Sequence, residues 1–308
     1  MRLVCQYLGL VLSIFVLAPL VLGLIRKVKA RLQNRIGAPI WQPAVDLIKL
    51  LRKRETLSTT ASWLFRFSAA LNLTLAVYLA IVLPWFSPKP HMGPCDLFMV
   101  IYVLAAMRLF TILAAMDAGS AFGAFAASRE ATLSFLVEPA AVLSLAALSV
   151  PAHTSDLVAI FNSTGGDHCA LWLLSGTALL LASLVELSRM PVDDPTTHLE
   201  LTMVHEAMIL EASAGNLALF EFAHAIKLTI LLALSSQCYL HAIVNPACCS
   251  NLTLVCLSSA ALLLVAVGVG VFESLAVKLY WRKAPEFIAY SLTLALLACI
   301  VALGAAFI

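Results

Sequence analysis

Ionisable residues gather in one stretch of a very apolar chain, between Glu186 and Lys227. The stretch contains Glu186, Arg189, Asp193, Asp194, Glu200, Glu206, Glu211, Glu221 and Lys227, together with His198, His205 and His224. Carboxylates, imidazoles and amines at this density could support water chains and proton exchange, hold a polar headgroup, or pair helices. Because apolar runs flank the stretch on both sides, we expect it to contain the functional site.

Three of these residues, Glu221, His224 and Lys227, recur every third position and would share one stripe of a helix. At a rise of ~1.5 Å per residue, Lys227 would lie roughly 15 Å below the membrane surface. Other apolar runs are interrupted by Arg108, Glu138 and Glu273. Charges inside membrane spans usually face a bundle interior or a water-filled cavity. The pattern therefore predicts a polar vestibule that opens on one side and ends half-way through the membrane.

The alternative is that these charges only pair with one another and fasten helices together, as Glu186 would with Arg189. Pairing alone does not require the charges to share one side of the bilayer, so we favour the vestibule. His224 alone could be a hydrogen-bonded packing residue, but a histidine pKa near about 6.5 also suits proton exchange where water reaches it. Neither His198 with His205 nor Glu200 with Glu206 has a metal-ligand spacing, so we predict no metal site.

The elements that position these residues must be membrane helices. The chain has 308 residues, of which 62% are hydrophobic and 12% charged, whereas an ordinary soluble domain has about 25% charged residues. An apolar run of ~20 residues spans the ~30 Å hydrocarbon core. We predict an all-α polytopic membrane protein, a single transmembrane domain over 1–308, with eight transmembrane helices. These spans are expected near 3–25, 66–86, 97–117, 131–151, 170–190, 218–243, 251–276 and 286–307.

Basic residues predict the orientation of these spans. The first long loop, about 26–65, is rich in lysine and arginine, and further basic residues flank the other loops on the same side. Only Arg2 and Lys89 lie on the opposite side. The positive-inside rule therefore places the long loops in the cytoplasm and both termini outside.

Two of the cytoplasmic loops carry structure of their own. From Pro43 to Leu57, apolar and basic residues alternate as expected of a short helix lying in the membrane interface, which could also help to shape a site. The loop at about 190–217 is predicted to be a lid over the vestibule. In it, Thr196 or Thr197 would cap a helix that runs to Met208. A simply solvated acidic loop is the alternative.

The eight cysteines carry no cofactor signature, because no CxxC pair or Cys/His cluster is present. Cys95, Cys169, Cys248 and Cys249 fall in or beside loops on one side, where a disulfide is one option and free thiols are the other. We predict no cofactor in this chain. The lipid bilayer is its expected surrounding, and we predict no nucleic-acid partner.

Three motifs resemble the family of mitochondrial subunit 1 of respiratory complex I and its relatives in membrane-bound NiFe hydrogenases. They are Ala30–Pro39 with Gln42–Leu50, Ala127–Ala131 through Glu138-Pro139, and the stretch that opens at Glu186. They occur in the family's order over nearly the whole chain. The resemblance implies a subunit that joins a peripheral redox arm to a membrane arm through a glutamate-lined funnel. In complex I, the same subunit also forms much of the quinone chamber.

The run from Val192 to Met208 departs from the complex I pattern and resembles the hydrogenase-4 and formate-hydrogenlyase branch. His224 also stands where complex I proteins tend to carry a glutamate. These departures favour the hydrogenase branch, which reduces protons and needs no quinone. The alternatives are a quinone-chamber subunit of a respiratory complex I and a stand-alone secondary transporter. The absence of internal sequence repeats disfavours the transporter.

We therefore predict the membrane-anchor and coupling subunit of an energy-converting NiFe hydrogenase in a prokaryotic plasma membrane, an enzyme only as part of its complex. The resemblance implies hydrogenase large and small subunits, an iron–sulfur subunit and antiporter-like membrane subunits as partners, with the NiFe centre and iron–sulfur clusters in those partners. The predicted coupling path contains Glu138, Glu186, Glu206, Glu211, Glu221, His224 and Lys227. The predicted interface with the peripheral arm contains Arg35, Asp46, Arg129, Glu130, Arg189, Asp193 and Asp194.

Overall fold

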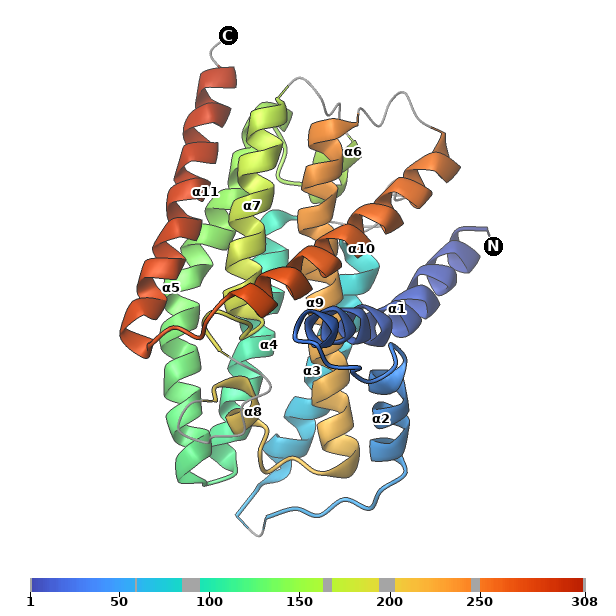
Figure 1. Cartoon of the computed structure of the whole chain (residues 1–308), viewed down its shortest axis with the longest axis vertical. Helices are drawn as coiled ribbons and strands as arrows, with labels where there is room; N and C mark the ends of the chain where they lie inside the picture. Colours follow the sequence, from blue (N-terminus) through green and yellow to red (C-terminus); the bar gives the residue numbers. More distant parts are fainter. Residues whose placement is uncertain are drawn as a thin grey trace.

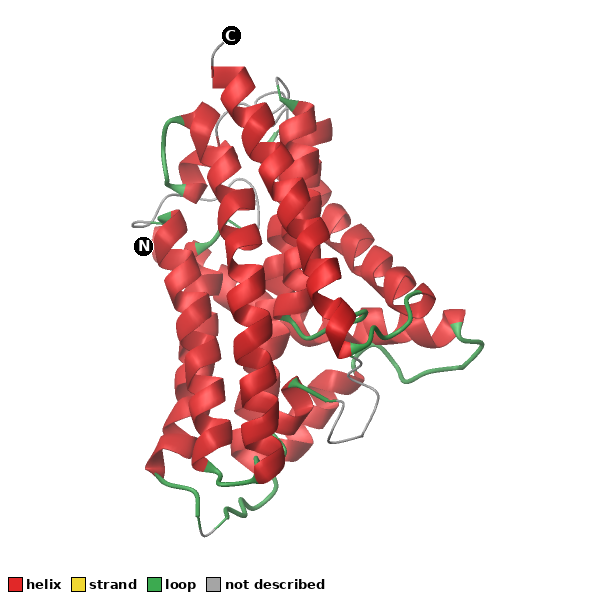
Figure 2. Cartoon of the chain, turned by 90° about the vertical axis from the view of Figure 1, so that its left-hand side faces the viewer, coloured by secondary structure: helices red, strands yellow, loops and turns green. Residues whose placement is uncertain are grey.

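A computed structural model describes residues 2–58, 60–84, 95–162, 168–193, 203–244 and 250–306. Within these ranges every long element is a helix (Figure 2). The helices are α1 (Arg2–Leu32), α2 (Gln42–Leu51), α3 (Trp63–Val82), α4 (Leu97–Asp117), α5 (Ala121–Ala152), α6 (Leu157–Asn162), α7 (Cys169–Glu186), α8 (His205–Met208), α9 (Ala214–Ile243), α10 (Asn251–Leu275), the 3-10 helix η2 (Trp281–Lys283) and α11 (Ala284–Ala306).

Seven helical segments of the described chain are long and apolar enough to cross a membrane. They are α3, α4, α5, α7, α9, α10 and the segment formed by η2 with α11, and each overlaps a predicted span. The predicted first span, α1, is not among the seven, and its last two turns carry Arg26, Lys27, Lys29 and Arg31. An all-α polytopic membrane protein is therefore confirmed, whereas the eighth span remains a prediction.

Helix α9 forms the centre of the bundle (Figure 1). It is the most buried of the candidate spans, with 72% of its apolar window buried. Helices α5, α7 and α11 pack together, whereas α1 and α10 pack against each other and run obliquely across the others. We call the part of the bundle around α8 the α8 half and the part around α6 the α6 half.

A glycine on α7 sets the distance between α7 and α9. A Cβ atom on Gly176 would lie 2.9 Å from Cβ of Cys238 and 3.2 Å from the ring of Tyr239, closer than packed side chains approach. Glycine therefore allows the two helices to lie in close contact. This contact aligns the end of α7, which carries Glu186, with the middle of α9, which carries Lys227.

Two boundaries differ from those predicted around the fourth and fifth spans. Helix α5 begins at Ala121 rather than near 131, because the hydroxyl of Ser120 accepts a hydrogen bond from the backbone N–H of Gly123 and caps it. Arg129 and Glu130, expected beside a loop, therefore lie within a helix. Helix α7 ends at Glu186 rather than near 190.

The two loops expected to be structured are described in part. Helix α2 is present but ends at Leu51 rather than Leu57. The described residues of the lid form only α8, while residues 194–202, including Asp194, His198, Glu200 and the predicted helix start, lie outside the described residues. Cys95 and Cys169 are free thiols, so they form no disulfide, and Cys248 and Cys249 also lie outside the described residues.

Candidate functional site

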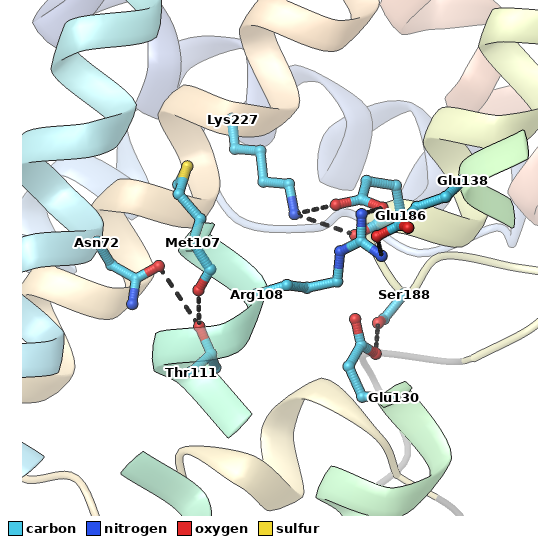
Figure 3. A network of polar contacts seen from close by, with 9 residues as sticks. All are labelled: Asn72, Met107, Arg108, Thr111, Glu130, Glu138, Glu186, Ser188 and Lys227. Carbon is cyan, nitrogen blue, oxygen red and sulfur yellow. Dashed lines mark hydrogen bonds and ion pairs between the residues drawn. The ribbon is translucent and has the colours of Figure 1, made fainter. Parts of the chain in front are cut away.

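Four charged side chains from four helices form a chain of ion pairs in the middle of the bundle (Figure 3). Nη1 of Arg108 on α4 lies 3.0 Å from Oε1 of Glu138 on α5, and Nη2 lies 2.9 Å from Oε2 of Glu186 on α7. Nζ of Lys227 on α9 lies 2.5 Å from Oε1 of Glu186. We call Glu138, Arg108, Glu186 and Lys227 the inner network. Its negative and positive charges alternate across the bundle.

The inner network is shielded from the surroundings except at one end. Arg108 and Lys227 are 7% and 8% exposed, whereas the side chain of Glu138 is 40% exposed. Charges buried in a low-dielectric interior persist only when they are paired and hydrogen-bonded. The half-exposed carboxylate of Glu138 is therefore the point at which this network reaches the side of the bundle.

Arg189 does not pair with Glu186, so the sequence-adjacent pair considered above is wrong. The chain leaves α7 through Ser188, whose φ of 47° is left-handed, and Arg189 then turns toward α10. Its Nη1 lies 3.0 Å from Oε1 of Glu273. Nζ of Lys29 on α1 lies 3.9 Å from the other oxygen of the same carboxylate. This second cluster therefore joins the end of α7 to the oblique helices α1 and α10.

Glu130 points into the bundle rather than toward a surface partner. The residue is 5% exposed, and the hydroxyl of Ser188 donates a hydrogen bond of 3.3 Å to its Oε2 (Figure 3). Its place within α5, which follows from the early start of that helix, explains this direction. Glu130 therefore belongs to the buried charges, whereas the sequence had predicted it at the interface with the peripheral arm.

A cavity of about 420 Å³ lies in the α8 half, and we call it the outer cavity. Its wall contains three residues of the predicted path, Glu206, Glu221 and His224. Arg26, Lys29, Arg189, Asp193, His205 and Glu273 also line it. A cavity of this size with many polar groups meets the conditions for holding ordered water. The vestibule predicted from the sequence has this cavity as its structural counterpart.

A second, smaller cavity lies deeper and connects these groups to the inner network. It has a volume of about 40 Å³, enough for about one water molecule, and we call it the inner cavity. Arg108, Glu130, Glu186 and Lys227 line it. A third, mostly apolar cavity of about 40 Å³ contacts Arg108, Glu138 and Glu186. Polar groups therefore follow one another from the outer cavity to Glu138.

Asp193 anchors the described part of the lid. Its Oδ1 lies 2.9 Å from Nζ of Lys278, and its Oδ2 accepts a hydrogen bond of 2.8 Å from the backbone N–H of Val204. Val204 immediately precedes α8, so this carboxylate fixes the position of His205. Burial, together with the nearby positive charge of Lys227, lowers the pKa of His205 to about 4. His205 is therefore neutral at neutral pH.

The structure leaves the remaining predicted residues apart from this cluster. Glu211 and Arg35 are exposed, and Asp46 lies on α2, where it accepts a hydrogen bond from Gln42. The guanidinium of Arg129 lies 4.4 Å from the ring centroid of Trp281, a cation–π contact near the start of α11. None of these four lines the outer or the inner cavity.

Arg108, Glu273 and His205 join the site although they belonged to neither the predicted path nor the predicted interface. Arg108 and Glu273 had a clear signal, because each is a charge inside an otherwise apolar run. His205 had only its place in the ionisable stretch, and the fold shows that its ring stacks on His224, with ring centroids 4.4 Å apart. The described part of the chain holds no group of three or more His, Cys, Asp or Glu side chains that could bind one metal ion.

Several known proteins are similar to this chain in sequence. The chain is 33% identical to "Hydrogenase-4 component C" of Escherichia coli over 72% of this chain and 70% of that protein. It is 32% identical to "Formate hydrogenlyase subunit 4" of the same organism, covering 72% of each chain. "NADH-ubiquinone oxidoreductase chain 1" of Tamias sibiricus is 30% identical over 72% of this chain and 71% of that protein.

The fold has a counterpart in an archaeal respiratory membrane complex, the membrane-bound sulfane sulfur reductase. A chain of that complex matches with a TM-score of 0.83 over 98% of this chain and 100% of that one. At 19% identity, this likeness concerns the fold alone. The family model described as NADH dehydrogenase matches residues 5–303. The resemblance predicted from the sequence is thus confirmed, and the chain belongs to the NADH dehydrogenase family.

Proposed function

We propose that this chain is the membrane-anchor and coupling subunit of an energy-converting NiFe hydrogenase of the hydrogenase-4 or formate-hydrogenlyase type. Its role is to link redox chemistry in partner subunits to ion movement in the membrane. The two Escherichia coli relatives, at 33% and 32% identity, support this branch of the family. The observation that carries the coupling role is the series of buried polar groups from the outer cavity through the inner network to Glu138.

In this proposal, the α8 half faces the cytoplasm, both termini lie outside, and α1 is the eighth span of a single transmembrane domain. The hydrogenase large, small and iron–sulfur subunits would dock on the α8 half and carry the NiFe centre and iron–sulfur clusters. Arg35, Asp46 and Arg129, together with Asp194, would contact them. Antiporter-like membrane subunits would lie beside the half-exposed Glu138, where the inner network reaches the side of the bundle.

A matched pair of carboxylate substitutions tests the coupling role. Glu138→Gln removes a proton-exchanging group at the end of the network, whereas Glu211→Gln makes the same change at an exposed residue outside it. The assembled complex, reconstituted into liposomes, is assayed for protons translocated per H2 formed. We expect Glu138→Gln to lower this ratio at least about 10-fold and Glu211→Gln to leave it unchanged. An unaltered ratio in Glu138→Gln would remove the basis of the proposal.

A quinone-reducing complex I subunit is the second candidate. The 30% identity to NADH-ubiquinone oxidoreductase chain 1 favours it. So does a side cavity of about 210 Å³ between α1, α2 and α9, with apolar walls formed partly by Leu22, Leu47 and Leu50. Quinone-dependent, inhibitor-sensitive turnover by the purified complex, without hydrogen evolution, would establish this function in place of the hydrogenase role.

A further inference from the structure

His205 and His224 stand between the two polar cavities. Both residues line the outer cavity and both line the inner cavity, and no other described residue lines the two. Their rings stack with centroids 4.4 Å apart and planes inclined by 30°. One ring comes from α8 and the other from α9. A polar species that moves between the cavities along their shared boundary therefore passes these two rings.

The chemistry on either side of the pair suits a proton. Glu206 and Glu221 line the outer cavity, and Glu130 and Glu186 line the inner one. Among the described residues, Nε2 of His205 is buried and has no hydrogen-bond partner. Buried polar atoms without a partner are uncommon, and such an atom usually bonds to a water molecule or takes part in the chemistry of the site.

The two rings cannot both be imidazolium at once, because two positive charges at this distance would repel each other. Further cations line the two cavities: Arg26 and Lys29 on α1, Arg108 on α4, Arg189 after α7 and Lys227 on α9. The opposing carboxyl groups are Asp193, Glu206, Glu221 and Glu273 on the outer side and Glu130 and Glu186 on the inner side. The low pKa of His205 agrees with a pair that is neutral at rest.

We propose that His205 and His224 form a relay that passes one proton at a time between the outer cavity and the inner network. The inference rests on the coupling role proposed above. A carboxyl group of the outer cavity, Glu206 or Glu221, gives its proton to an imidazole nitrogen. The imidazolium then releases a proton through the inner cavity to the carboxylate of Glu130. The histidines return to their neutral form, and the reverse sequence carries a proton outward.

The test compares His205→Gln, His224→Gln and the double variant in the reconstituted complex, with His153→Gln as the control. His153 is exposed at the end of α5, so its substitution removes an imidazole without touching either cavity. Each relay variant should lower the proton-to-H2 ratio at least about 10-fold. Because both residues serve one path, the double variant should be no worse than the poorer single one. Hydrogen evolution from a soluble electron donor should persist and shows that the complex is assembled.

Chemical rescue separates proton transfer from packing. In His205→Ala, added imidazole should restore part of the ratio, whereas pyrrole, which has a similar size but no basic nitrogen, should not. Equal responses to both compounds would show that the ring only fills space and would overturn the relay. The rescue experiment on His205→Ala also tests the relay if a glutamine variant fails to assemble.

Ser188 offers a competing link, because it lines the outer cavity and bonds to Glu130 of the inner one. If Ser188→Ala lowers the ratio and the histidine variants do not, the proton avoids the pair and the relay is wrong. Unchanged ratios in both histidine variants, alongside a lowered ratio in Glu138→Gln, would likewise reject the relay while retaining the coupling role. Unchanged ratios in all of these variants, Glu138→Gln included, would reject the coupling role itself.

Discussion

The two halves of α9 satisfy their buried polar groups in different ways. In the α8 half, His224 stacks on α8 and Lys227 pairs with Glu186 on α7. In the α6 half, the hydroxyls of Ser235 and Ser236 donate hydrogen bonds to carbonyl oxygens of their own helix. His241 is the uncharged exception there, because its Nε2 lies 2.6 Å from the carbonyl oxygen of Phe161 on α6. Groups satisfied within one helix do not depend on its neighbours. Groups satisfied between helices do, so a change of charge in the α8 half must alter how the helices hold together.

The largest difference between the halves should appear when the centre of the inner network is removed. Arg108→Met leaves the carboxylates of Glu138 and Glu186 without their shared cation. We expect a loss of about 3–5 kcal/mol in the free energy of unfolding, the usual cost of leaving buried charges unpaired. Thermal unfolding of the purified complex measures it. Arg52→Met, at an exposed residue, is the control and should change stability little.

The next largest effect should be the pH dependence that His205, in the α8 half, gives to the free energy of unfolding. His205 remains neutral in the folded protein down to about pH 4, whereas an unfolded histidine takes up a proton near about pH 6.5. Between these values the unfolded state binds more protons, so stability falls as the pH falls. The contribution of this residue from pH 7 to pH 5 is about 2 kcal/mol. His205→Asn should flatten the slope by that amount, and an unchanged slope would contradict the neutral, buried ring.

In the α6 half, stability should depend on the spacing between helices rather than on charge. Gly176→Ala would place a Cβ atom 2.9 Å from Cβ of Cys238, and overpacking of this kind costs about 1–3 kcal/mol. It should also separate Glu186 from Lys227 and lower coupled activity. Gly268→Ala is the matched control, because nothing lies within 4 Å of the added atom. If both variants had equal stability, the close contact of α7 and α9 would not be a constraint.

The smallest effect is expected where a polar group is satisfied by its own helix. The hydroxyl of Ser236 donates a hydrogen bond of 2.7 Å to the carbonyl of Ala233. Ser236→Ala removes the donor and leaves that carbonyl in the helical hydrogen-bond ladder. The unfolding free energy should change by about 0.5 kcal/mol or less, and proton translocation should not change. A large loss of translocation would extend the polar path into the α6 half.

The sequence predicted the spans well, because a run of ~20 apolar residues is a strong local signal. It was less informative about where helices begin, since the cap at Ser120 brought Arg129 and Glu130 into α5. It also could not identify partners: Glu186 pairs with Arg108 and Lys227, which are distant in sequence, rather than with nearby Arg189. Glu206 and Glu211 lie in the same ionisable stretch and each precedes an alanine, yet Glu206 lines the outer cavity and Glu211 is exposed. Only the tertiary fold separates such residues.

The left-handed turn at Ser188 fixes the chain length at the end of α7. Ser188 bonds to Glu130 on α5, while the next residue, Arg189, pairs with Glu273 on α10. Consecutive residues thus fasten two helices. Deleting Ser188 would bring Arg189 into its place, putting a guanidinium against Glu130 and leaving Glu273 without its closest cation. Labels or tags should therefore be inserted elsewhere in the chain.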